Sequence, residues 1–158
     1  MEKVIICTYD QQFLPEKKTP GAVCRDLKIA QPITIKPQEV VLVGTGVKTV
    51  LPLGRHAKMY ARSGLPIKSG LQLANSVAVL DSDYRGEWLI QLYNITQETK
   101  IFEAGSRLTQ FEIVPTYTVS TSRELPEINY LVDQETYDQF DTLFPSQRGE
   151  WGFNSTWL

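Results

Sequence analysis

Short apolar runs separated by turn residues dominate the first 115 positions, and this pattern restricts the fold most strongly. The runs are rich in β-branched and aromatic residues and cover residues 4–9, 39–43, 47–51, 58–61, 71–73, 77–80, 88–93 and 108–114. Prolines and glycines separate them at a spacing typical of all-β sandwiches and barrels. In the run 88–93, Trp88, Ile90 and Leu92 fall on one side of the expected strand. The sequence therefore predicts an all-β protein with a jelly-roll-like β barrel.

Residues 116–147 differ from this pattern. Pro126 stands near a potential first helical turn, and Ile128, Leu131 and Val132 follow at helical spacing. We therefore predict a short helix within residues 116–147, which separate a β-barrel core at 1–115 from a flexible C-terminus at 148–158. All three parts belong to one domain, because 158 residues suit a single core.

Charge and composition exclude several classes of function. The 16 basic and 18 acidic residues give a net charge of −2, so no overall positive field favours nucleic acid. Cys7 and Cys24 are too few for a disulfide scaffold and lack metal-ligand spacing, which indicates reduced thiols. No long apolar segment or targeting signal is seen, so we expect a soluble, cytoplasmic protein with no membrane partner.

Residues 75–86 carry the most informative local pattern, Asn-Ser-Val-Ala-Val-Leu-Asp-Ser-Asp-Tyr-Arg-Gly. An apolar run ends at Leu80, and the turn that follows presents Asp81, Tyr84 and Gly86. Turn chemistry accounts for the aspartates and the glycine but not for the tyrosine. An aromatic ring beside carboxylates suits a nucleoside pocket, although an ordinary hairpin would give the same pattern.

Three further motifs surround this hairpin. Arg62-Ser63-Gly64 precedes it and offers groups that bind phosphate oxygens, Arg107-Leu-Thr-Gln110 follows it, and residues 148–156 begin with Arg148-Gly and end with Ser155-Thr156. In this order and spacing the motifs resemble those of the trimeric dUTPase family, over the chain from about residue 20 onward. That family hydrolyses dUTP to dUMP and pyrophosphate, and the resemblance implies the same activity here.

The resemblance also assigns roles to residues. Asp81 matches the catalytic aspartate, which activates a water molecule while Mg²⁺, held mainly by substrate phosphates and water, neutralises charge. Asp83 is expected to be a turn or supporting residue, and the lone His56 a structural or surface residue. The substrate-binding residues that the resemblance implies are Asn75, Val79 and Leu80 at the uracil, Tyr84 at the deoxyribose, and Arg62, Ser63, Gly64 and Gln110 at the phosphates.

Two motifs depart from the family pattern. Val-Cys-Arg-Asp26-Leu replaces the usual Ala-Gly-x-Asp-Leu, so Asp26 either supports the site or is a structural aspartate. Ala78 stands where glycine is common, and Arg107 is too ambiguous to include in the site.

The resemblance implies that residues 148–158 form a flexible lid, in which Arg148 grips the terminal phosphate, Phe153 covers the uracil, and Ser155 and Thr156 also bind substrate. Trp151, Asn154 and Trp157 replace small residues there, so the closed form either differs from the family's or is anchored more firmly. The resemblance also implies that residues 116–147 are an inserted arm, because the distance between the last two motifs is shorter in the family. The family is a homotrimer whose sites are shared between subunits, and we expect the same arrangement.

Two alternatives compete with this hypothesis. The related dCTP deaminases share the barrel, but they need an arginine where Ile67 stands and a catalytic glutamate where Gln91 stands. Glutamine cannot relay a proton as a carboxylate does. The other alternative is a regulatory β-barrel protein that binds a protein partner through residues 116–147, and such a role is compatible with catalysis.

Overall fold

The computed structural model describes residues 3–116 and 126–150 of the chain. Its strands are β1 (Lys3–Thr8), β2 (Arg25–Lys28), β3 (Ile33–Ile35), β4 (Val40–Gly44), β5 (Val47–Val50), β6 (Arg55–Ala61), β7 (Leu71–Leu73), β8 (Ala78–Leu80), β9 (Leu89–Asn94), β10 (Lys100–Phe102), β11 (Arg107–Pro115) and β12 (Glu127–Val132). The helices are short: η1 (Gln11–Phe13), α1 (Leu65–Ser69), α2 (Gln134–Asp138) and α3 (Phe140–Leu143). The predicted all-β class is confirmed, and none of the helices in the described ranges could span a bilayer.

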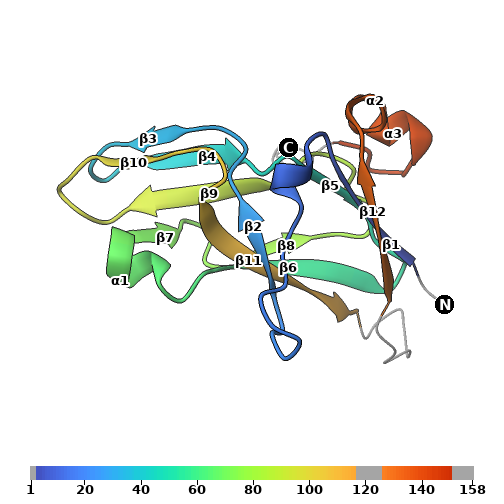
Figure 1. Ribbon diagram of the computed structural model, residues 1–158, viewed down its shortest axis with the longest axis horizontal. Helices are drawn as coiled ribbons and strands as arrows, with labels where there is room; N and C mark the ends of the chain where they lie inside the picture. Colours follow the sequence, from blue (N-terminus) through green and yellow to red (C-terminus); the bar gives the residue numbers. More distant parts are fainter. Residues whose placement is uncertain (1–2, 117–125, 151–158) are drawn as a thin grey trace.

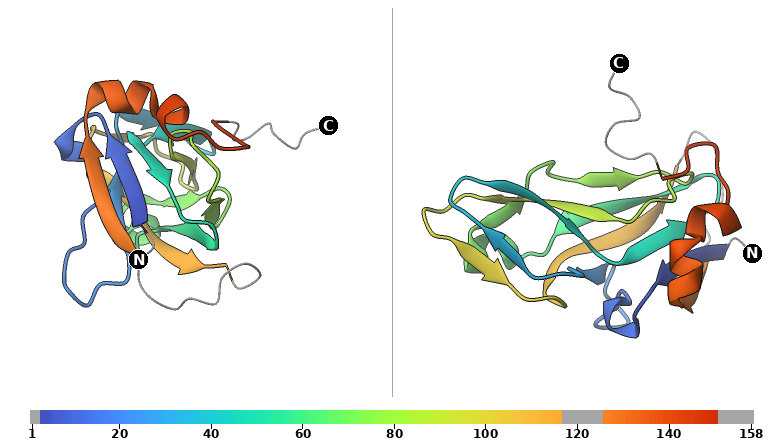
Figure 2. Two further views of the ribbon diagram at one scale, coloured as in Figure 1. Left: turned by 90° about the vertical axis from the view of Figure 1, so that its right-hand side faces the viewer. Right: turned by 90° about the horizontal axis from the view of Figure 1, so that it is seen from above.

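Hydrogen bonds group the strands into four sheets rather than one closed barrel. Their strand orders are β12-β1-β5, β10-β3, β2-β11-β6-β8 and β4-β9-β7. Figure 1 shows α1 at one end of the elongated molecule and α2 with α3 at the other, and Figure 2 shows the same separation from above. Strands β2, β3, β10 and β12 were not predicted from the sequence.

The main core lies between the sheets and includes Trp88, the largest of its fully buried side chains. Trp88, Ile90 and Leu92 are fully buried, which confirms the alternation expected for this strand. The Trp88 ring packs edge-on against Phe111 at 4.8 Å between ring centroids. Its indole nitrogen donates a hydrogen bond to Thr49 Oγ1 at 3.1 Å, so the ring is buried without losing its polar partner.

The short helix expected in residues 116–147 is present as α2 and α3, but it does not start at Pro126, because residues 127–132 form β12. This strand pairs in parallel with β1 over its whole length, from Lys3 opposite Glu127 to Thr8 opposite Val132. Over so short a segment the apolar spacing fits a strand as well as a helix. The strand is formed because the edge of β1 provides hydrogen-bond partners for its backbone N–H and C=O groups. The helical conformation starts later, where Asp133 Oδ2 accepts a hydrogen bond from Thr136 N at 2.6 Å as the N-cap of α2.

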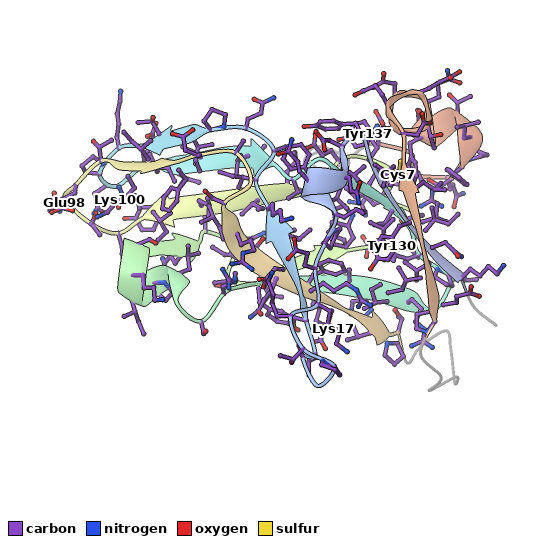
Figure 3. The ribbon with its side chains drawn as sticks, viewed as in Figure 1. Cys7, Lys17, Glu98, Lys100, Tyr130 and Tyr137 are labelled. Atoms are coloured by element: carbon purple, nitrogen blue, oxygen red, sulfur yellow. The ribbon has the colours of Figure 1, made fainter. Side chains whose placement is uncertain are left out.

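A second hydrophobic cluster joins this C-terminal region to β1. It consists of Cys7, Tyr137 and Phe140, all buried, and Figure 3 labels Cys7 and Tyr137 at the same end of the molecule. Both cysteines are free thiols, and burial raises the pKa of Cys7 to about 11. Lys48 Nζ lies 4.8 Å from the centre of the Tyr137 ring. Residues 127–143 therefore pack on β1 of their own chain; the division into core, arm and lid stays a prediction.

Candidate active site

The hairpin at residues 75–86 begins with a tight turn before β8. Ser76 has a φ of +62°, and Val77 N donates a hydrogen bond to Asn75 O at 2.7 Å. Strand β8 then pairs with β6, with Leu80 opposite Ala57. Within residues 3–116 and 126–150 β8 has no strand on its other side, so backbone groups along that edge are available to a ligand.

A pocket of about 270 Å³ opens beside this edge. It is lined by Asn75, Val77, Ala78, Val79, Leu80, Asp81, Tyr84, Leu89 and Arg148. The residues predicted to bind uracil, deoxyribose and reacting phosphate in the hairpin thus share one cavity with the first residue of the predicted lid. The pattern analysis did not include Val77 and Leu89, whose apolar character suited core strands equally well.

Tyr84 is fixed in this pocket by its neighbours. Its hydroxyl donates a hydrogen bond to Glu87 O at 2.9 Å, and burial raises the pKa of that hydroxyl. A Cβ atom at Gly86 would lie 2.4 Å from the tyrosine hydroxyl oxygen and 2.6 Å from Cζ. Glycine at this position therefore leaves room for the ring, which explains the Tyr-Arg-Gly sequence.

Arg148 brings the C-terminal segment to Asp81. Its guanidinium forms an ion pair and hydrogen bond with Asp81 Oδ2, and its Cζ lies 5.4 Å from the centre of the Tyr84 ring. The two side chains retain exposures of 28% for Arg148 and 54% for Asp81, so both remain accessible to a ligand and to water. The other predicted lid residues, Phe153, Ser155 and Thr156, lie outside the described residues, as do Trp151, Asn154 and Trp157.

A second polar group forms around Asp26 on β2. The Asp26 side chain is 9% exposed and lies 3.2 Å from Arg62 Nε and 3.5 Å from an Arg107 guanidinium nitrogen. Arg62 also donates a hydrogen bond to Arg107 O at 3.0 Å. Gln110, opposite Asp26 in the β2–β11 ladder, donates from Nε2 to Ala61 O at 3.3 Å. Asp26 thus orients two arginines beside the predicted phosphate motif.

These residues border a different cavity, of about 300 Å³. It is lined by Arg62, Ser63, Gly64, Leu65, Lys68, Ser69, Arg107 and Leu108. The chain therefore does not bring Arg62, Ser63 and Gly64 into the Asp81 pocket. Arg107, which was left out of the predicted site, belongs to this group; its position on the same strand as Gln110 was the available signal.

Comparisons with known proteins identify the chain's relatives. A family model for dUTPase matches residues 10–157. The deoxyuridine 5'-triphosphate nucleotidohydrolase of Desulfitobacterium hafniense is 40% identical over 146 residues, covering 90% of this chain and 86% of that protein. The enzyme of the same name from Chlamydia caviae is 36% identical and covers 96% of this chain and 97% of its own.

Solved structures agree with this assignment. The crystal structure of dUTPase from Streptococcus mutans superposes with a TM-score of 0.66 at 38% identity, covering 68% of this chain and 89% of that one. A Staphylococcus bacteriophage 80alpha dUTPase mutant with dUpNHpp has a TM-score of 0.65 and covers 98% of each chain, and at 20% identity this likeness concerns the fold alone. The chain belongs to the dUTPase family.

Proposed function

We propose that the protein is a dUTP diphosphatase, which hydrolyses dUTP to dUMP and pyrophosphate. The observation that carries this proposal is the single pocket shared by the β8 edge, Asp81, Tyr84 and Arg148. In this pocket, backbone groups can hydrogen-bond a base and a ring can pack against a sugar. A carboxylate can activate water, and a guanidinium can bind a phosphate. The family match favours this reaction over the deaminase alternative.

Asp81 acts as the base in the proposed reaction. Its carboxylate takes a proton from a water molecule while the water oxygen bonds to the α-phosphorus. The bond between that phosphorus and the oxygen bridging to the β-phosphate breaks, and pyrophosphate leaves. Asp81 directly follows β8 in the chain, and its exposed carboxylate is accessible to water.

The base and sugar are selected by different parts of the hairpin. Backbone groups near Asn75, Val79 and Leu80 pair with uracil, and the amino group of cytosine would reverse one of these contacts and leave polar groups unpaired. The Tyr84 ring lies beside C2′ of the sugar and leaves no room for a hydroxyl. Its hydrogen bond to Glu87 O holds the ring in place for this purpose.

The triphosphate is bound by two groups. Arg148 reaches the terminal phosphate from the lid, and Phe153, Ser155 and Thr156 complete the closed site. Arg62, Ser63, Gly64 and Gln110 bind the phosphates from a neighbouring subunit of a homotrimer, with Asp26 orienting Arg62. The separation of the Arg62 cavity from the Asp81 pocket within one chain supports a site shared between subunits.

Mg²⁺ is the proposed cofactor and is carried by the triphosphate. Among the described residues no group of three His, Cys, Asp or Glu side chains could hold a metal ion. The metal would be bound mainly by the phosphates of the substrate and by water. Asp81 is the carboxylate that lines the pocket beside β8. When bound, Mg²⁺ neutralises negative charge on the phosphates.

A nucleotide panel tests the proposal. dUTP, UTP, dCTP and dTTP are each incubated with the purified protein, with Mg²⁺ or with excess chelator, and the products are separated. We expect dUMP and pyrophosphate from dUTP with Mg²⁺ and little product from the others. Release of dUTP or ammonia from dCTP would instead identify a deaminase.

A further inference from the structure

The segment that carries Arg148 is fastened to the hairpin turn on both sides of this residue. Ser146 Oγ donates a hydrogen bond to Asp83 O at 2.5 Å and accepts one from Gly149 N at 2.8 Å. Arg85 N donates to Gly149 O at 2.7 Å, next to a parallel bridge between Tyr84 and Gly149. The backbone before and after Arg148 therefore follows the turn that contains Asp81 and Tyr84.

The Arg85 side chain ties the start of this segment to the same turn. Its Nε donates a hydrogen bond to Phe144 O at 2.7 Å, and one terminal nitrogen donates to Ser82 O at 2.8 Å and Tyr84 O at 3.2 Å. Only 7% of the residue is exposed, and burial lowers the pKa of the guanidinium. A buried cation that reaches carbonyls from both segments joins them, because losing it would leave these carbonyls without a donor.

Gly149 completes the arrangement through its backbone. Its φ is +60°, a conformation that other residues adopt only with strain, and a Cβ there would contact no atom within 4 Å. Glycine is thus favoured here by the backbone conformation and not by a lack of room for a side chain. This path turns the segment back so that Gly149 O reaches Arg85 N.

We infer that Ser146 and Arg85 are positioning residues that hold Arg148 over Asp81 and Tyr84. The inference rests on the proposed role of Arg148 in binding substrate phosphate. A long, flexible arginine side chain binds a phosphate more effectively when its backbone is already placed, because less conformational freedom is lost on binding. Ser146 is the more informative of the two, since its hydroxyl links Asp83 to Gly149 without filling the core.

The test compares Ser146→Ala, Ser146→Thr and Arg148→Ala, singly and as the double variant S146A/R148A, by kcat/KM for dUTP and by thermal unfolding. Ser146→Ala should lower kcat/KM about fivefold with a nearly unchanged melting temperature, and Ser146→Thr should keep most of the activity because the hydroxyl remains. In the Arg148→Ala background the serine change should have no further effect. Arg85→Lys, which keeps the charge but not the planar fork, should act in the same direction as Ser146→Ala.

The matched control is Thr142→Ala, which removes an exposed hydroxyl from α3 in the same C-terminal region and should leave kcat/KM unchanged. Equal losses from Ser146→Ala with and without Arg148 would overturn the inference, as would unchanged activity in Ser146→Ala. If Arg148→Ala alone keeps full activity, the proposed role of Arg148 fails, and the positioning role fails with it. A loss in Arg148→Ala without coupling to Ser146 leaves the proposed function intact and refutes only the positioning role.

Discussion

The guanidinium of Arg148 lies on the carboxylate of Asp81, which precedes it by 67 positions in the chain. Because both side chains are partly exposed, such a pair contributes no more than about 1 kcal/mol. A triphosphate carries more negative charge than one carboxylate and can therefore displace Asp81 from the arginine at little cost. This exchange would free the carboxylate for water at the moment that substrate binds.

Asp81→Asn should abolish hydrolysis while leaving dUTP binding largely intact. The amide keeps the shape of the side chain but cannot accept the proton, and a loss of about a thousandfold in kcat corresponds to roughly 4 kcal/mol of barrier. Steady-state rates and calorimetric titration with dUTP measure the two effects separately. Near-normal turnover would remove Asp81 from the mechanism.

Tyr84→Ala should relax the choice of sugar more than the choice of base. The variant removes the ring proposed to fill the space beside C2′, whereas backbone groups that read uracil remain. Tyr84→Phe is the matched control, since it keeps the ring and loses only the hydrogen bond to Glu87 O. The ratios of kcat/KM for dUTP over UTP and for dUTP over dCTP are compared. An equal fall of both ratios in Tyr84→Ala would argue against a sugar-specific role.

Gly86→Ala should displace the Tyr84 ring while leaving the tyrosine itself unchanged. The new Cβ would stand 2.4 Å from the Tyr84 hydroxyl oxygen, and the half-buried ring has to move to admit it. We expect about a tenfold loss of kcat/KM for dUTP and weaker discrimination against UTP. Gly21→Ala serves as the control, because nothing lies within 4 Å of a Cβ there. Unchanged kinetics in Gly86→Ala would show that the position of the ring is unimportant.

Mixed trimers should test whether sites are shared. Arg62→Gln and Asp81→Asn each inactivate every site of their own homotrimer, but in a mixed trimer one of the three shared sites combines a normal Arg62 with a normal Asp81. The chains are unfolded and refolded together, and mixed trimers are isolated by differential tags before assay. Activity no higher than in the separate variants would place Arg62 and Asp81 of each site on one chain.

Phe140→Ala should destabilise the whole protein if the C-terminal region is part of its core. The side chain is fully buried against Cys7 and Tyr137, and its loss should cost about 3–5 kcal/mol. Leu143→Ala on the same helix removes a side chain that is half exposed and should cost much less. Denaturant unfolding gives both values. Equal, small losses would support the predicted division of residues 116–147 into a separate arm.

The resemblance to the dUTPase family assigned Asn75, Leu80, Asp81 and Tyr84 to the candidate site. All four line one pocket, because they belong to a single hairpin. Arg107 was ambiguous because its partner Asp26 is reached only through the pairing of β2 with β11. The pairing register of two strands that are distant in the sequence cannot be predicted from a local pattern of residues.

The same reasoning explains the errors in the fold. The all-β class followed from many independent short runs. Strand β12, in contrast, depends on pairing with the distant β1, and its apolar spacing fitted the period of a helix as well as that of a strand. Arg85 was seen in the sequence only as part of a turn. Its contact with Phe144 O joins segments that no spacing rule connects.

The parallel pairing of β1 with β12 also has a consequence for how the protein is made. Strand β1 gains its partner on that side only after residue 132 has been synthesised. Until then β1 can pair with β5 alone, and one of its edges stays exposed to other nascent chains. Efficient production should therefore depend on delaying aggregation until β12 has been synthesised, and expression at lower temperature should raise the yield of folded protein.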